Sequence, residues 1–432
     1  MRLNRRQFLG GAATVAGAAA LSGCGGGGSG GGNVLNVSAC NHPWSNYIKD
    51  LLPEFEEEHD VKVQLNEFQA DQLSTMYSTR LSANATDLDV MMYRPLQEGV
   101  QFMRNEWLLD LDASAAGDTA YDLADFQEAA MEVVKVDSAV YGIPIVTERE
   151  VLFYRKDLLD VAGISVPETM EDLEDAAEML TDPASGVFGI AMRGQKAAAV
   201  TQFSGFLYSY GADFMTESGE ASIDTPEAIA AYTMYGDLLR NYGPEGVESM
   251  STEQINPLFQ QGKIAMFIDA EVFWSELIRE GTSTVAADQL GVAPLPAGPA
   301  GSKPYSVPSW ALAVNAKTTK ADLSWEFVKW ATSPDMVLAA QQAGVSGART
   351  SVWENPDSLT GIPEDFQETL RVSTENGVGY DRPRVVQVGR ARDIVGEPLI
   401  AAIRGEDVTA AAQTAQANFA AFLEEDATAT GE

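Results

Sequence analysis

The chain has 432 residues, of which 45% are hydrophobic, so it is long and apolar enough for two or three packed domains. Its 63 acidic residues outnumber the 28 basic ones and give a formal charge of −35. A field of that sign repels nucleic acid and anionic lipid headgroups, and we therefore expect no nucleic-acid partner.

The first residues have the composition of an export signal. Arg5 and Arg6 precede Phe-Leu and a weakly apolar run over 10–23, which is too short to span a bilayer. The paired arginines resemble a twin-arginine signal, which exports folded proteins. The Leu-Ser-Gly before Cys24 resembles a lipobox, so we expect a signal peptide over 1–23 and a lipid on Cys24. An ordinary amphipathic first helix is the alternative.

A glycine-rich segment follows at once. Residues 25–32 have almost no side chains to bury and are expected to form a random coil spanning roughly 15 Å. We interpret 24–33 as an anchor and tether that holds the folded body at the extracellular face of the cell membrane. The alternative is a terminus without a function.

Strand and helix patterns alternate from residue 34 onward. Strands are predicted at 34–39, 61–68 and 87–93, with a helix over 44–59. This order is typical of an α/β fold with a mostly parallel sheet, in which ligands bind beyond the carboxyl ends of the strands. The residues that follow the strands are therefore expected to lie along one rim: 41–44, 66–69, Tyr93 and Arg94.

The alternation continues through the rest of the chain, without an internal repeat of fixed period. The turn-rich segment 294–299 is expected to cross between parts of the fold. The remaining predicted elements are helices at 123–136, from 170, and at 226–242, 252–261, 321–332 and 401–423, an apolar stretch at 202–210, and strands at 142–146, 151–154, 187–192, 264–268 and 307–314.

Cysteine and histidine are too few to suggest metal chemistry. With Cys24 assigned to the lipid, Cys40 has no partner, and we expect it to be a small buried hydrophobe. Only His42 and His59 supply imidazole, and no Cys/His spacing indicates zinc. We therefore predict no metal and no cofactor.

The acidic residues are spread along the chain, and Arg outnumbers Lys. A dispersed acidic coat with little Lys is typical of a protein that works in concentrated salt, because salt screens the self-repulsion. We interpret it as halophilic adaptation, and the organism as a halophilic archaeon. A cation-binding surface is the competing interpretation.

Several segments in a consistent order carry a resemblance to one family: 141–144 (YGIP) with 152–158 (LFYRKDL), 163–173 (GISVPETMEDL), 259–266 (FQQGKIAM), 325–334 (WEFVKWATSP) and 381–384 (DRPR). Together they resemble the extracellular solute-binding proteins of ABC importers, of the type that includes maltose-binding protein. Within that family, the "WEFVKWATSP" segment and the "DRPR" segment lean towards members that take up polyols.

The resemblance implies a two-lobed periplasmic-binding-protein fold of type II, with a hinge of crossing strands. It assigns 34–143 with 312–345 to the first lobe, 150–305 with 350–425 to the second, and 426–432 to a tail. It implies a monomer that captures a sugar or polyol between the lobes and delivers it to permease subunits, without catalysis.

A sugar needs polar partners for its hydroxyls and an aromatic ring for its C–H face. The aromatic candidates follow strands or lie in a crossing segment: Trp44, Trp274 and Trp310. The polar candidates are Glu148 and Arg149 in the hinge, where an ion pair is the alternative, with Asp269, Glu271, Arg349, Arg94, Asn41 and His42. Glu67, Asp71, Arg193 and Arg382 are weaker candidates, since such residues usually form surface ion pairs.

Two other classes of protein remain as alternatives. A secreted carbohydrate-active hydrolase would need two carboxylates about 5–9 Å apart, which an acidic chain supplies by chance. Outside the glycine-rich segment 25–32 there is no Gly-x-Ser-x-Gly, and the chain has no His-Glu-x-x-His or phosphate-loop motif that would support an enzyme. A surface adhesin would normally show repeats or an all-β pattern.

Overall fold

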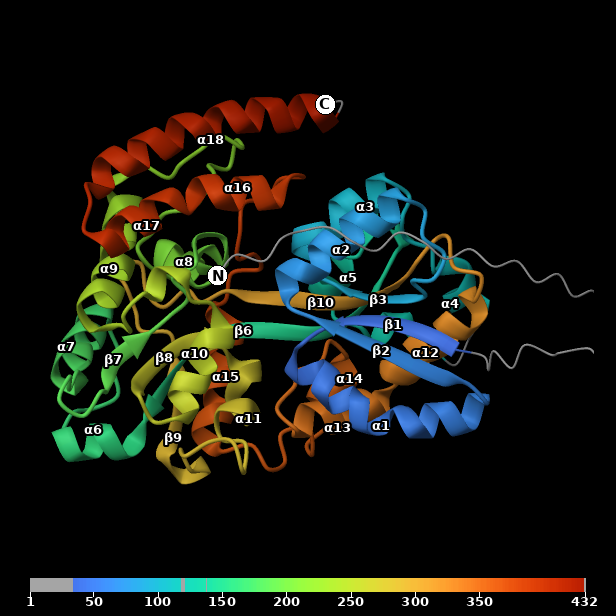
Figure 1. Cartoon of the computed structure of the whole chain (residues 1–432), viewed down its shortest axis with the longest axis horizontal. Helices are drawn as coiled ribbons and strands as arrows, with labels where there is room; N and C mark the ends of the chain where they lie inside the picture. Colours follow the sequence, from blue (N-terminus) through green and yellow to red (C-terminus); the bar gives the residue numbers. More distant parts are fainter. Residues whose placement is uncertain (1–33, 118–120, 137, 431–432) are drawn as a thin grey trace, which may run out of the picture.

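The computed structural model describes residues 34–117, 121–136 and 138–430, so the predicted signal, Cys24 and the tether lie outside the described residues. The fold has two α/β lobes joined by two long strands, β6 (Ile143–Arg155) and β10 (Ser306–Val314) (Figure 1). The predicted fold class is confirmed.

The first lobe is built on parallel strands. β1 (Val34–Cys40) pairs with β2 (Lys62–Phe68) on one side and with β3 (Val90–Tyr93) on the other, and β10 continues the sheet antiparallel to β3. Every second side chain of β1 is buried in the core of this lobe, as a strand with a period of two requires. The other elements of this lobe are α1 (Pro43–His59), α2 (Ala70–Ser82), η1 (Pro95–Gly99), α3 (Val100–Arg104), α4 (Asp112–Gly117), η2 (Leu123–Asp125), α5 (Glu128–Glu132), β4 (Lys135–Val136), β5 (Ala139–Val140) and α12 (Ala321–Ala331).

The second lobe packs helices on both faces of its sheet. β6 pairs there with β8 (Ile264–Ala270) and β9 (Leu290–Pro294), and β7 (Phe188–Ala191) is parallel to β8. Leu152 and Tyr154 face one core cluster, while Val151 and Phe153 face another. The helices are α6 (Lys156–Ala162), α7 (Met170–Leu180), α8 (Lys196–Ser209), α9 (Pro226–Tyr242), η3 (Val247–Ser249), α10 (Thr252–Gln260), η4 (Glu271–Phe273), α11 (Trp274–Leu277), η5 (Ala287–Gln289), α15 (Glu364–Asn376), α16 (Val388–Val395), α17 (Glu397–Arg404) and α18 (Val408–Thr430). Two short helices, α13 (Pro334–Gln342) and α14 (Thr350–Glu354), lead into it from the first lobe.

One continuous strand crosses between the lobes where two were predicted. The first part of β6 pairs with β10, and from Glu150 onward it pairs with β8 and β9. The predicted crossing at 294–299 is wrong, because Pro294 ends β9 and the chain crosses back in β10. Val146 lies opposite Trp310 in this ribbon, and Glu148 lies opposite Val307.

Three further expectations differ from the structure. Residues 123–136 form two short helices and a strand instead of one helix. The helical region at 401–423 is interrupted at Gly405, whose φ of +72° gives the left-handed cap that glycine adopts readily. Residues 426–430, expected in a tail, continue α18.

The core divides along the same lines as the two lobes, with one buried cluster in the first and two in the second. The residue boundaries given for the lobes remain predictions. Within the described ranges, no helix combines the length and the apolar character needed to cross a membrane.

Candidate functional site

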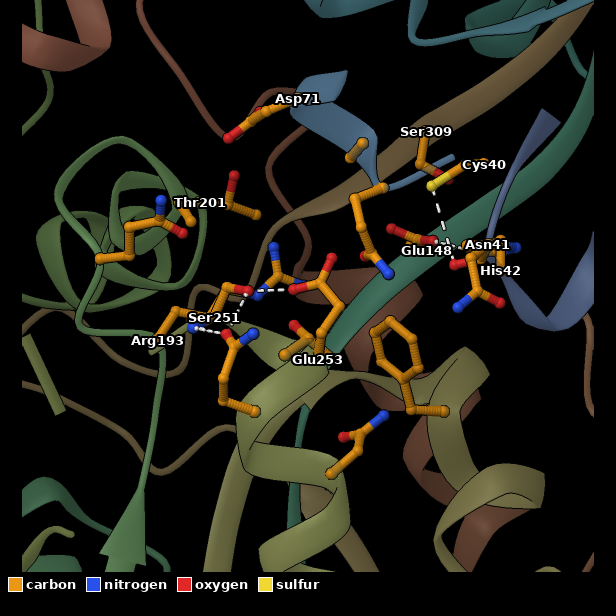
Figure 2. A pocket seen from close by; sticks show the side chains of 18 of the residues that line it. Cys40, Asn41, His42, Asp71, Glu148, Arg193, Thr201, Ser251, Glu253 and Ser309 are labelled. Carbon is orange, nitrogen blue, oxygen red and sulfur yellow. Dashed lines mark hydrogen bonds and ion pairs between the residues drawn. The ribbon is translucent and has the colours of Figure 1, made fainter. Parts of the chain in front are cut away.

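A cavity of about 760 Å³ lies between the lobes, a volume within the range of small-molecule sites, roughly 300–1,000 Å³. Figure 2 shows Asn41, His42 and Glu148 on one side of it, with Arg193 and Thr201 on the other. Other wall residues are Cys40, Gln69, Asp71, Gln72 and Arg94 from the first lobe, Ser309 and Trp310 from β10, and Ser251, Glu253, Phe273, Asp381, Arg382 and Arg392 from the second lobe.

The first-lobe wall consists of residues that follow parallel strands. Asn41 and His42 follow β1, Gln69 follows β2, and Arg94 follows β3. The carboxyl ends of parallel strands meet at one edge, which is why these side chains converge on the cavity. Of the predicted rim, Asn41, His42, Gln69 and Arg94 lie in the wall, whereas the other residues of 41–44 and 66–69 and Tyr93 do not.

Trp310 provides a largely buried aromatic surface, with 7% of its area exposed. The His42 ring centroid lies 5.6 Å from the Trp310 centroid, and the Arg94 guanidinium carbon lies 5.7 Å from it. Glu98 accepts two hydrogen bonds from the Arg94 side chain, 3.1 Å from Nε and 2.7 Å from Nη2, and so holds it in place. The wall therefore offers an indole flanked by a cation.

His42 is held in one tautomer by its two neighbours. Its Nδ1 accepts a hydrogen bond of 3.1 Å from the backbone N–H of Trp44, so a neutral ring carries its proton on Nε2. That Nε2 lies 3.0 Å from Oε1 of Glu148, whose side chain is 13% exposed. Glu148 is thereby oriented at the cavity as a hydrogen-bond acceptor.

Arg193 is positioned by Asp269, which lies behind the wall and is fully buried. The Arg193 Nε and Nη2 atoms donate to the Asp269 carboxylate at 3.2 and 2.6 Å. Gln202 and Thr252 also donate to it, at 2.8 and 2.7 Å, so every lone-pair direction of the carboxylate is engaged. Burial lowers the pKa of Arg193, but the charge and hydrogen bonds of Asp269, together with Tyr305 and Glu148, outweigh burial and raise the pKa, which keeps the guanidinium charged.

A second pair of an arginine and a carboxylate lies on the same wall. Arg382 makes a two-pronged contact with Asp381, donating at 2.6 Å through Nε. Burial raises the pKa of Asp381, but the Arg382 guanidinium, with smaller contributions from Arg392 and Thr201, reverses this and holds the pKa below its ordinary value. The neighbouring Arg392 donates 3.1 Å to Thr201 Oγ1.

Several predicted ligand contacts instead form buried structural pairs, and these predictions are corrected. Arg149 and Glu271 are 3% and 0% exposed and pair at 3.0 Å, with Arg149 above the ring of Trp353. Neither lies in the cavity wall, because each satisfies the other's charge inside the hinge. Asp269 does not line the cavity and instead holds Arg193 in place from behind the wall.

Arg349 is likewise structural. It is 1% exposed, pairs with Asp125 at 2.8 Å and lies 4.2 Å above the centroid of Phe126. Its Nε donates 2.7 Å to the carbonyl of Thr332. These contacts fix α14 to the first lobe, and the guanidinium does not reach the cavity.

Two of the three predicted tryptophans also lie outside the wall. Trp44 is 2% exposed and belongs to the core of the first lobe, because it faces inward from α1. Trp274 packs against Phe366 with centroids 5.5 Å apart and covers a core cluster of the second lobe. Trp310 is the aromatic candidate that remains, with Phe273 added by the structure.

Several polar and charged residues of the cavity wall were ranked low from the sequence or were not found at all. Arg193, Arg382 and Asp71, treated as weak candidates, line the wall, and Arg392 and Thr201 were missed. The "DRPR" segment had been noted only as part of the resemblance. Cys40 is buried as expected, and burial raises the pKa of its thiol to about 12. The described residues contain no cluster of acidic, His and Cys side chains suited to a metal ion.

Comparison with protein families places the chain clearly. The model of the bacterial extracellular solute-binding protein family matches residues 42–337. A mannitol-binding protein of Pseudomonas aeruginosa is 27% identical over 329 residues, covering 74% of each chain. An erythritol/L-threitol-binding protein of Mycolicibacterium smegmatis is 27% identical over 353 residues, covering 76% of this chain and 72% of that protein.

Solved structures agree with these relatives. A solute-binding protein of Agrobacterium radiobacter in complex with ribitol has a TM-score of 0.80 and 25% identity, covering 90% of this chain and 99% of that one. A protein of Agrobacterium vitis with bound D-mannitol has a TM-score of 0.78 and 27% identity, covering 92% and 99%.

Proposed function

The chain belongs to the bacterial extracellular solute-binding proteins, and we propose that it is the monomeric substrate-binding component of an ABC importer that captures a sugar or polyol between its lobes. The family is one of binding proteins that act outside the cytoplasm, which argues against the hydrolase and adhesin alternatives. Permease subunits of the importer are the expected partners.

The observation that carries the proposal is the composition of the cavity wall. Trp310 offers an apolar ring, and around it Asn41, Glu148 and Arg193 offer an amide, a carboxylate and a guanidinium. Hydroxyl groups donate to the carboxylate and accept from the guanidinium, while a C–H face stacks on the ring. Exclusion of water from a closed cleft strengthens such charge-assisted hydrogen bonds. The polyol-binding relatives support the same class of ligand.

The proposed mechanism is lobe closure around the solute. The wall draws side chains from both lobes and from the crossing strands, so a bound solute bridges them. A ligand shifts the equilibrium only by its difference in affinity for the two states, and one that contacts both lobes favours the closed one. The permease then receives the solute from the closed form.

The test is titration of the mature protein with a panel of sugars and polyols in high salt, followed by intrinsic tryptophan fluorescence and calorimetry. We expect saturable binding at one site per chain, near micromolar affinity, or about −8 kcal/mol. A panel in which no carbohydrate or polyol changes either the fluorescence or the melting temperature would refute the sugar or polyol assignment. Turnover of a ligand would favour an enzyme instead.

We further propose export by the twin-arginine route and lipid anchoring at Cys24. Replacing Arg5 and Arg6 with Lys should block export, and Cys24→Ser should release the exported protein from the membrane fraction into the medium. Export through the general secretion route, or a Cys24→Ser protein that stays in the membrane fraction, would contradict the corresponding step.

The acidic coat supports adaptation to concentrated salt. We expect the mature protein to lose its fold as salt is removed, because its self-repulsion is then unscreened. Urea unfolding in a series of salt concentrations measures this directly. Equal stability in salt-free buffer and in molar salt would refute the halophilic interpretation.

A further inference from the structure

Arg392 stands out among the charged residues of the cavity. Its side chain is 5% exposed, lies in the wall, and belongs to α16 of the second lobe. Its Nη1 donates 3.0 Å to Gln97 Oε1 and its Nη2 donates 3.1 Å to Thr201 Oγ1, both neutral acceptors. Its Nε–H is buried and has no hydrogen-bond partner among the described residues.

The charges around Arg392 do not balance. Gln97 Oε1 also accepts 2.9 Å from Nη1 of Arg382, so two guanidinium groups meet at one oxygen atom. The carboxylate of Asp381 is already engaged by Arg382 through two contacts. No carboxylate of the described chain forms an ion pair with Arg392, which leaves one buried positive charge without a direct partner.

Two acids attract Arg392, but neither forms an ion pair with it. Asp381 is engaged by Arg382, and Asp71 lies 3.9 Å from Arg94 with its side chain 75% exposed, so that water screens its charge. Burial, and then the charge of Arg382, lower the pKa of Arg392, while Asp381 and Asp71 oppose this. A buried charge without a direct partner is unfavourable, and an oxygen anion bound there would offset that cost.

We propose that the corner formed by Arg392, Arg382 and Thr201 binds an acidic oxygen group, so that the solute is a sugar or polyol derivative with a carboxylate or a phosphate at one end. The inference rests on the proposed function, since the same cavity holds the rest of the solute. The hydroxyl-bearing part then extends towards Trp310 and Glu148, where a neutral chain finds a ring and an acceptor.

The experiment compares solutes of one carbon skeleton at constant ionic strength: glucitol, gluconate and glucitol 6-phosphate. Calorimetry on the full mature protein should show at least one of the two acids binding tenfold or more tighter than glucitol. Whichever acid is favoured identifies the group as a carboxylate or a phosphate. If glucitol binds as tightly as both acids, or tighter, the proposed subsite is refuted while the polyol function stands. If none of the three binds, and no other sugar or polyol does, the proposed function itself fails.

Substitutions test whether the preference for the acidic solute depends on the side chain of Arg392. Arg392→Gln should abolish the ratio between acid and glucitol affinities, whereas Arg392→Lys should retain part of it. The matched control is Arg371→Gln, which removes an equal charge from a half-exposed arginine outside the cavity that already pairs with Glu368. An unchanged ratio in Arg392→Gln, with melting showing a folded protein, would refute the assignment. If Arg392→Gln does not fold, the ratio in Arg392→Lys and in Thr201→Val decides the question, since both substitutions change the corner without removing its charge.

Discussion

Asn46 and Glu276 join the two lobes directly. The Asn46 Nδ2 atom, in α1 of the first lobe, donates a hydrogen bond of 3.0 Å to Glu276 Oε1, in α11 of the second. The contact of Gln97 with Arg382 and Arg392 is a second link between the lobes. These links connect the lobes through contacts that do not depend on a solute.

Removing either link should shift the ligand-free protein towards an open state. For Asn46→Ala or Gln97→Ala we expect a loss of about 1 kcal/mol from closure, the usual value of one hydrogen bond, and hence affinity about fivefold weaker. Small-angle scattering should show a larger radius of gyration without ligand. Asn105→Ala, an exposed change elsewhere in the first lobe, is the control. An unaltered radius and affinity in both variants would show that the links do not contribute to closure.

Trp310 should contribute to affinity through stacking. Its replacement by Ala should weaken binding of the best sugar or polyol by about 1 kcal/mol or more, whereas Phe should retain part of the effect. Because Trp310 lines the cavity, the variant should also lose much of the ligand-dependent fluorescence change. Trp107→Phe, in the first lobe away from the cavity, is the control. Unchanged affinity in Trp310→Ala would remove this residue from the site.

Asp269 should contribute to both stability and ligand affinity, although it does not line the cavity. Asp269→Asn leaves the Arg193 guanidinium without its counter-charge, and loss of one partner of a largely buried pair costs about 3 kcal/mol. Urea unfolding at fixed salt should show this loss, and calorimetry should show weaker binding because Arg193 is no longer held. The exposed Asp50→Asn controls for the change in net charge. A variant as stable as the parent would mean that water solvates the charge of Arg193 in place of the Asp269 carboxylate.

The part of the site that could be predicted is the part set by local pattern. Alternation of strand and helix is visible in single segments, and it places Asn41, His42 and Arg94 at the ends of neighbouring strands. Trp310 could be predicted as a cavity residue because it lies in a crossing strand. In these cases the sequence position alone determines which edge of the sheet a side chain reaches.

The rest depends on pairings between distant segments. Gln97 and Arg392 are 295 residues apart, and nothing in either segment indicates the other. A charged residue of a crossing segment has the same sequence pattern whether it lines the cavity, as Glu148 does, or forms a buried pair, as Arg149 does with Glu271. Only the tertiary structure distinguishes the two outcomes.

Glu150, at the point where β6 passes from one lobe to the other, is a fully buried carboxyl group whose two oxygens have no hydrogen-bond partner within the described residues. Gly205 packs against it so closely that an added Cβ would lie 1.8 Å from Oε2. Burial, opposed by the Tyr305 backbone and by Arg193 and assisted by the negative charge of Asp269, holds the pKa of Glu150 well above its ordinary value. The raised pKa favours the protonated form of this group in the folded protein.

This raised pKa has a definite consequence for stability. Between the ordinary pKa of Glu, about 4.3, and the raised value, the folded protein holds a proton that the unfolded chain releases, so stability falls as pH rises. Glu150→Gln lacks this titration. We expect its free energy of unfolding to exceed that of the parent by a margin that grows from pH 5 to pH 8, by up to about 1.4 kcal/mol per pH unit below the raised pKa. Urea unfolding across that range measures the margin, with the exposed Glu171→Gln as control. A margin that stays constant with pH would show that Glu150 is ionised in the folded protein, with water or a cation meeting its charge in the hinge.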